Sequence, residues 1–177
     1  PAPGSSAVSV GAAVGVNVAK HSNSAVVRNA IIRADGLELA ADSSEVQAVV
    51  SAASGYSDAS IGVGGAVTVL VGSAKTLALV ENNADLTLGS GGLNISAAAD
   101  TSFENEADGS AKGQGSSLGV GASIAVSVTG VDTLAWVEDG VAIKSLTPDG
   151  IGSVNIEANT VESSLVSARA GSAGGIS

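Results

Sequence analysis

The chain has 177 residues, of which 45% are hydrophobic, and 17 acidic side chains against seven basic ones give it a formal net charge of −10. This hydrophobic content argues against a disordered chain, and the negative charge argues against binding to nucleic acid or to an anionic membrane surface. The chain has no cysteine, so we expect no disulfide bridges. Its uncharged stretches alternate in polarity, so we expect no membrane insertion.

The hydrophobic side chains are of an unusual kind. Val, Ala, Leu and Ile supply nearly all of them, whereas there is one Trp, one Tyr, one Phe and no Met. Small and β-branched side chains favour thin, closely stacked β-layers over an aromatic-rich enzyme core. The 24 glycines need a structural reason as well, which we expect to be turns or backbone packed on backbone.

The first predicted strand begins at Val8 and recurs twice. Residues 8–18, 61–71 and 118–128 align without gaps, start 53 and 57 residues apart and contain no charged residue. Apolar side chains occupy every second position, which is the period of a β-strand with one buried face. We therefore expect the Val, Ile and Leu side chains to face the core. The other face carries Gly, Ser, Ala, Thr and Asn, which indicates a closely packed or partly wet surface.

The alignment continues downstream in the same register. Residues 23–28, 76–81 and 133–138 form a second matching block, and residues 37–41, 93–97 and 154–158 form a third. Between the blocks the copies differ in length, at Gly89–Gly92 and at Pro148–Gly152, and we expect both segments to be turns or loops.

One segment of the first copy has helical spacing. Val46, Val49, Val50 and Ala53 would share one face of a helix, but the matching stretch of the second copy, residues 101–112, has no such face. Since copies of a repeat share a fold, we interpret this region as strand plus loop.

The blocks divide the chain into units of about 55 residues, at 8–60, 61–117 and 118–175, and Ile176 would open a fourth. This repeat predicts an all-β fold, namely a parallel β-solenoid in the form of a right-handed β-helix. At ~20 residues per rung each unit would supply two or three rungs, giving a rod about 30–45 Å long. Inward Val, Ile and Leu would form ladders, and the Gly-rich unit starts would lie at corners. A β-sandwich is the alternative.

Three motifs carry a family resemblance. They are Gly62-Val63-Gly64-Gly65-Ala66-Val67-Thr68-Val69, Thr133-Leu134-Ala135-Trp136-Val137 and Val154-Asn155-Ile156-Glu157-Ala158. In this order they resemble the repeats of giant secreted bacterial proteins, the filamentous adhesins of the leukotoxin type and autotransporter-like surface proteins. The resemblance covers nearly the whole chain and implies an exported, elongated β-solenoid used as a stalk or adhesive surface, with no catalytic residues. The first copy departs from the pattern at Ser9, Gly15 and Ser24.

The sequence carries only weak signals for hydrolytic or zinc chemistry. Gly115-Ser116-Ser117-Leu118-Gly119 matches the G-x-S-x-G nucleophile elbow, which requires a strand-to-helix turn and a later His. The only His is His21, upstream in a predicted loop, and Gly/Ser-rich turns produce this motif by chance. With one His and no Cys we expect no zinc site. We therefore assign no catalytic, cofactor-binding or metal residue, and we expect that the chain is not an enzyme.

Two acidic clusters could serve polysaccharide cleavage. Asp132, Glu138 and Asp139 lie in the third copy, and Glu104, Glu106 and Asp108 lie in the second. A lyase also needs a basic group, and the nearby lysines, Lys112 and Lys144, are sparse. The simpler interpretation of both clusters is a solvated outer face.

Acidic loops would allow incidental calcium, although the calcium-binding β-roll and EF-hand motifs are both missing. An ice-binding face would need regular Thr ladders, and only Thr76 and Thr133 match between copies. Asn94-Ile95-Ser96 is a glycosylation sequon at chance level.

The sequence therefore predicts a structural or adhesive segment of an extracellular bacterial protein at the cell surface or in a filament. We expect it to act as a stiff rod that self-associates, either head-to-tail through unpaired solenoid ends or along the rod, with a host or matrix receptor as a further partner. The alternative is a carbohydrate-binding or carbohydrate-cleaving β-helix module, against which the scarcity of aromatic side chains speaks.

Overall fold

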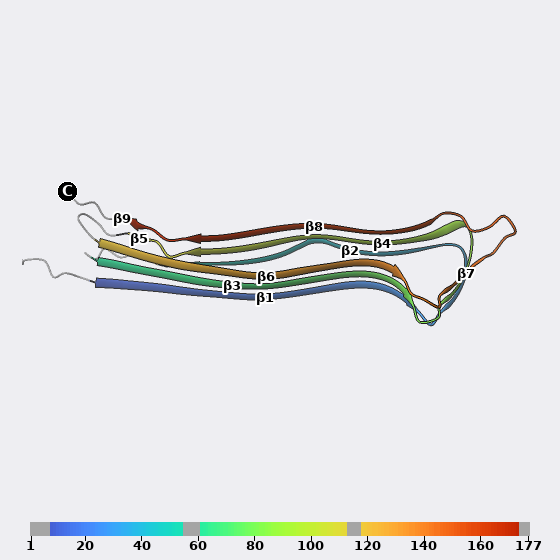
Figure 1. Ribbon diagram of the computed structural model, residues 1–177, viewed down its shortest axis with the longest axis horizontal. Helices are drawn as coiled ribbons and strands as arrows, with labels where there is room; N and C mark the ends of the chain where they lie inside the picture. The colour runs from blue at the N-terminus through green and yellow to red at the C-terminus, as the bar shows by residue number, and fades with distance from the viewer. Residues whose placement is uncertain (1–7, 55–60, 113–117, 174–177) are drawn as a thin grey trace, which may run out of the picture.

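The computed structural model describes residues 8–54, 61–112 and 118–173, and it consists of long strands in two facing sheets (Figure 1). The β1 sheet contains β1 (Val8–Arg28), β3 (Ile61–Glu81) and β6 (Leu118–Val137). The β2 sheet contains β2 (Ile31–Ala53), β4 (Asp85–Asp108), β7 (Ala142–Ser145) and β8 (Val154–Arg169). The short strands β5 (Ala111–Lys112) and β9 (Ser172–Ala173) pair with each other. All these pairs are parallel and the described residues contain no helix, so the predicted all-β parallel fold is confirmed.

The strand register follows the sequence alignment of the copies. In the β1 sheet Val8 pairs with Ile61 and Ile61 pairs with Leu118. In the β2 sheet Leu93 pairs with both Leu37 and Val154. Residues that the alignment equates are therefore direct neighbours across a parallel ladder, and each unit forms a single layer.

The expectation of two or three rungs per unit is therefore wrong. β1, β3 and β6 contain 21, 21 and 20 residues, so a single strand is already as long as the ~20 residues assumed for a whole solenoid rung. At ~3.3 Å per residue each strand spans about 70 Å, whereas three strands in a sheet are only about 14 Å wide. The described chain is a long, thin plate rather than a rod, and Figure 1 shows the strands running side by side along its length.

Short turns join the two sheets at one end of the plate (Figure 1). Between β1 and β2 the chain reverses at Asn29, and between β3 and β4 it reverses at Asn82 and Asn83, all three with positive φ. Asn tolerates this left-handed conformation better than other residues with a side chain. In the third copy Gly140 has positive φ at the corresponding turn.

Large side chains of the β2 sheet pack against small ones of the β1 sheet. Leu86, Leu88 and Ile95 are fully buried and lie in one core cluster with Ala78 and Val80. A second cluster surrounds Phe103. A Cβ built on Gly72 would lie 2.6 Å from Cδ1 of Phe103, so the ring occupies the space that a side chain at position 72 would need.

The buried face of the first block is therefore the opposite of the predicted one. In β3, Gly62, Gly64 and Ala66 are buried, whereas Val63 and Val67 are exposed. The reason is the close approach of the two sides of the plate here: a Cβ on Gly64 would lie 2.7 Å from Oγ of Ser54, so only small residues fit inside. In the β2 sheet the expected burial of Leu and Ile is confirmed, since Leu93 and Ile95 face the core.

The Gly-rich unit starts lie within strands and not at corners. A Cβ on Gly64 would lie 2.9 Å from the backbone oxygen of Gly109, which follows β4 on the opposite side of the plate. One end of the plate is thus closed by backbone packed on backbone, which only small residues allow.

Differences in length between the copies are absorbed at irregularities in the β2 sheet. The register shifts between Ala34 and Gly36, opposite the longer Gly89–Gly92 segment, which lies within β4 and not in a loop. Residues 146–153, which include the predicted Pro148–Gly152 loop, separate β7 from β8. A second shift, between Ser43 and Val46, leaves Glu45 with positive φ. The segment with helical spacing, residues 46–53, is part of β2, as interpreted from the repeat.

Candidate interaction surface

The outer side of the β1 sheet carries a flat apolar surface. Its members are the outward side chains of residues 8–18, 61–71 and 118–128, which we call the valine face. Ten of them are exposed Val, Ile or Leu in the two outer strands: Val8, Val10, Val14, Val16, Val18, Leu118, Val120, Ile124, Val126 and Val128. Val10 and Val14 are 73% and 74% exposed, whereas Val63 and Val67 in the central strand are 38% and 36% exposed. Monomeric proteins rarely expose so large a contiguous apolar patch without an interaction that uses it.

A groove crosses the valine face at right angles to the strands. Ala12, Gly65 and Ala122 form its floor, because they pair across the sheet and are the small members of the outward rows. The groove has a volume of about 200 Å³ and is bordered by the row of Val14, Val67 and Ile124. A Cβ on Gly65 would meet no atom within 4 Å, so this floor is open.

The outer side of the β2 sheet is acidic. Its strands alternate between buried apolar residues and outward polar ones. The outward carboxylates, which we call the acidic face, are Glu38, Asp42, Asp85, Asp100, Glu104, Glu106, Asp108 and Glu157. The two broad surfaces of the plate therefore differ in kind, because the valine face is apolar and uncharged whereas the outer side of the β2 sheet is negative.

Both sheets end in open edges within the described residues. β1 pairs only with β3, and β2 pairs only with β4, so the first layer has one unpaired side. β6 and β8 leave the corresponding side of the third layer unpaired. Unpaired strand edges are templates for further strand pairing.

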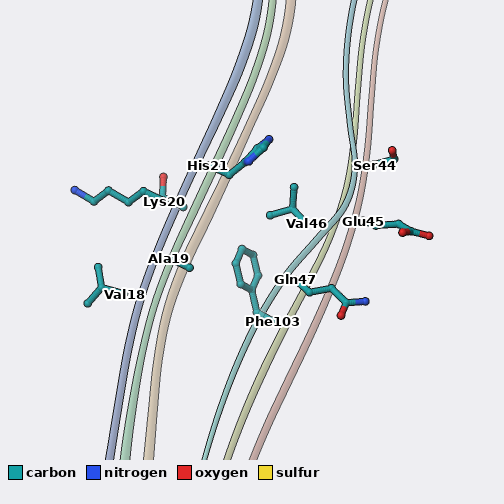
Figure 2. Close-up of a pocket in the computed structure, with 10 residues that line it drawn as sticks. Val18, Ala19, Lys20, His21, Ser44, Glu45, Val46, Gln47 and Phe103 are labelled. Carbon is teal, nitrogen blue, oxygen red and sulfur yellow. The ribbon is translucent and has the colours of Figure 1, made fainter.

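A cavity of about 500 Å³ lies between the sheets at the level of the first layer. Figure 2 shows Ala19, His21, Val46 and Phe103 directed into this space, whereas Lys20 and Glu45 point away from it on opposite sides. The bulge at Glu45 widens the gap between β1 and β2 here. His21 is the one ionisable side chain directed into this space in Figure 2.

The exposed side chain of His21 joins a short polar chain with Ser43 and Thr76, which are both buried. Its Nε2 lies 3.3 Å from Oγ of Ser43, and Thr76 Oγ1 donates to the same oxygen at 2.8 Å. The predicted loop position of His21 is wrong, because it lies within β1. Thr76 is buried, and Thr133, which pairs with it, also faces inward, so neither belongs to an exposed Thr ladder.

The two acidic clusters lie in different places. Asp132 lies 3.4 Å from Lys75 in the neighbouring strand, and Glu138 accepts a hydrogen bond from the backbone of Asn82. Glu104 and Glu106 lie on the acidic face, where Arg169 Nε is 3.9 Å from Glu106 Oε1. Sequence reasoning missed this arginine, because it is 63 residues away along the chain and reaches Glu106 only through the parallel register.

The other residues considered for a site lie apart from one another. Lys144 Nζ lies 2.6 Å from Oδ2 of Asp85, in an ion pair between layers. Asn94 of the sequon is on the acidic face. The side chain of Lys112 and most of the G-x-S-x-G motif, residues 115–117, lie outside the described residues. Over the described ranges no three His, Asp or Glu side chains are grouped closely enough to hold a metal ion. No helix of the described chain could span a membrane.

Comparison with protein families, with curated proteins and with solved structures found no match for this chain. The similarity to filamentous adhesins therefore stays a prediction based on the repeat motifs. The valine face was visible in the sequence as uncharged alternation, but sequence reasoning assigned it to the core.

Proposed function

We propose that the chain is a structural, adhesive segment of an extracellular bacterial surface protein, built as a right-handed parallel β-solenoid in which each repeat unit forms one layer. The observation that supports this most is the residue-by-residue pairing of equivalent positions, from Val8 with Ile61 to Arg28 with Glu81. A crossover between parallel strands of one sheet, such as β1 to β3 through β2, is right-handed in the great majority of proteins. The mechanism is mechanical and needs no cofactor.

Side chains at stacked positions support the proposal, because they interact along the stacking direction. Arg28 Nε donates to Glu81 Oε1 at 2.6 Å, and Asn155 Nδ2 donates to Asn94 Oδ1 at 3.0 Å. Each bond joins equivalent residues of neighbouring layers. Such cross-strand pairs stabilise one register against slippage. An array of these units would therefore resist bending without disulfide bridges.

The open edges would let such segments stack head-to-tail. The carbonyl of Val80 accepts from the amide of Glu138, which directly follows β6. The neighbouring position Leu79, and every second residue from it, therefore bonds toward β1. Leu77 therefore bonds to β1, and its partner Ser24 directs its own N–H and C=O away from β3. Alternate residues of β1 thus present unpaired backbone groups at the edge.

Ser24→Pro tests head-to-tail stacking, with Ser24→Thr as the matched control. Proline removes an edge N–H that has no partner in the parallel ladder, so we expect an intact fold by circular dichroism but fewer and shorter filaments in electron micrographs. The threonine variant should assemble like the unaltered chain. Equal assembly by both variants, or no filaments from the unaltered chain at any concentration, would contradict edge stacking.

The second candidate is a carbohydrate module, which one observation favours. Glu104, Glu106 and Arg169 line a depression of about 130 Å³ on the outer side of the β2 sheet. Its volume is below the ~300 Å³ of typical ligand sites, and no aromatic side chain lines it. Incubation with a panel of acidic glycans tests it: cleavage or binding that is lost in Glu106→Gln would favour this function over the structural one.

A further inference from the structure

The valine face is an exposed sheet surface with the dimensions of an interface. Eleven residues along each strand at ~3.3 Å, and three strands at ~4.8 Å, make it about 36 Å by 14 Å, or about 500 Å². Every outward position on it is Val, Ile, Leu, Ala or Gly, and the three segments that form it contain no charge. A polar row with Lys75 and Asp132 lies beyond it along the same strands.

The rows of the valine face complement themselves under a two-fold rotation. In β1 the outward residues are 8, 10, 12, 14, 16 and 18, and their centre lies at position 13. We name each row across the three strands by its β1 residue, so that row 12 is Ala12, Gly65 and Ala122. A two-fold axis through this centre, parallel to the stacking direction, brings row 12 of one copy opposite row 14 of a second copy. The Val14 row would then enter the groove above Ala12, and the reverse contact would form at the same time. Rows 10 and 16, and rows 8 and 18, meet as pairs of large side chains.

We propose that the valine face binds the valine face of a second copy of this chain, forming a two-fold symmetric sandwich of two β1 sheets. Facing sheets in β-sandwiches pack about 10 Å apart through interleaved apolar side chains, which is the arrangement that ridge and groove allow here. Charge supports the choice of partner. The chain carries a net charge of −10, and its other broad surface holds the acidic face, so of the two broad surfaces the valine face is the one on which two copies meet without charge repulsion.

The area sets the expected strength. Two faces of about 500 Å² bury about 1,000 Å², which is the lower limit for a specific interface. Three layers should therefore dimerise reversibly and weakly. Each further layer would add about 170 Å² per copy, because one strand adds ~4.8 Å of width. The axis runs along the stacking direction, so both copies can be extended in the same direction, and this pairing is independent of head-to-tail stacking.

Val14→Lys tests the pairing against Val49→Lys as its matched control. Both are exposed valines on strands of the first layer, but Val14 is on the valine face and Val49 is on the outer side of the β2 sheet. By sedimentation equilibrium we expect the unaltered chain to approach twice its monomer mass as concentration rises. Val14→Lys should lower the association constant of the dimer at least tenfold, and Val49→Lys should change that constant less than twofold.

Gly65→Val tests the groove without adding charge. Its φ is negative and a Cβ there meets nothing, so valine should leave the monomer as stable or more stable while blocking the partner's ridge. The control is Ala98→Val on the outer side of the β2 sheet. Loss of dimer in Gly65→Val but not in Ala98→Val supports the proposal.

Three results would overturn face-to-face pairing. The first is equal dimer strength in Val14→Lys and Val49→Lys. The second is association that Ser24→Pro abolishes and Gly65→Val leaves unchanged, which would assign all self-association to strand edges. The third is a chain that stays monomeric but binds neutral phosphatidylcholine vesicles through Val14, which would assign the valine face to a lipid surface.

Discussion

The contact between Phe103 and Gly72 tests how the two sheets face each other. Phe103 is 1% exposed, and its ring lies where a Cβ of residue 72 would be. Truncation of a buried Phe to Ala costs about 3–5 kcal/mol. Gly72→Ala alone forces an overlap with the ring and should cost about 2 kcal/mol. In the Phe103→Ala background the same methyl group enters vacated space and should instead stabilise by about 1 kcal/mol.

The predicted coupling between these two positions is therefore about 3 kcal/mol. Urea denaturation, followed by circular dichroism and by the fluorescence of Trp136, gives the four free energies of unfolding that the cycle needs. Gly130→Ala is the matched control, because a Cβ there meets nothing and alanine should stabilise by about 0.5–1 kcal/mol in both backgrounds. If Gly72→Ala has the same effect with and without the Phe103 ring, the described facing of the sheets is refuted.

Three further predictions concern smaller contributions. Thr76→Val removes the buried bond to Ser43 and should lower the free energy of unfolding by about 1 kcal/mol in urea denaturation, whereas the exposed-side change Thr87→Val should have little effect. Lys144→Ala breaks a solvent-exposed ion pair with Asp85, so it should cost less than about 1 kcal/mol, and the cost should disappear in 1 M NaCl. Because no described group of three ligands could hold a metal, calcium and a chelator should leave the thermal midpoint unchanged in calorimetry; a calcium-dependent rise would contradict this.

The register between paired strands was the part of the fold that could be predicted most directly from the sequence. Equivalent residues of the copies, such as Val8, Ile61 and Leu118, are neighbours in the sheet because parallel stacking pairs like with like. The period of two also predicted the alternation of faces along each strand. Neither signal depends on long-range packing.

The buried face could not be read from one strand alone. Alternation separates Val63 and Val67 from Gly64 and Ala66, but which set faces inward depends on the opposite sheet. A Cβ on Gly64 would lie 2.9 Å from the backbone oxygen of Gly109 on the opposite side, so only small residues fit between the two sides at this end. The number of layers per unit was missed because the assumed rung length was too short, and because the turn signal at Gly89–Gly92 lies inside the long strand β4.

The valine face was missed because the buried and exposed faces of the first block are the reverse of those predicted. With small residues inside, the Val side chains of the first block form an exposed face, which sequence reasoning had placed in the core. The pairing of Glu106 with Arg169 was also missed, because Arg169 pairs in the ladder with Asp108 and reaches Glu106 two residues away on the same face, beyond the block in which the copies were aligned.

The most direct test of the central claim, that each repeat unit forms one layer in register with the next, is a disulfide between stacked positions. The chain has no cysteine, so Lys75→Cys with Asp132→Cys introduces a single pair. Their Cα atoms are neighbours across β3 and β6, about 4.8 Å apart, which is within the range that a disulfide spans. The offset control, Lys75→Cys with Leu134→Cys, places the Cα atoms about 8 Å apart, beyond that range. Mild oxidation should cross-link the first pair completely and the second hardly at all. Failure of the first pair to close, or equal closure of both, would contradict one layer per repeat.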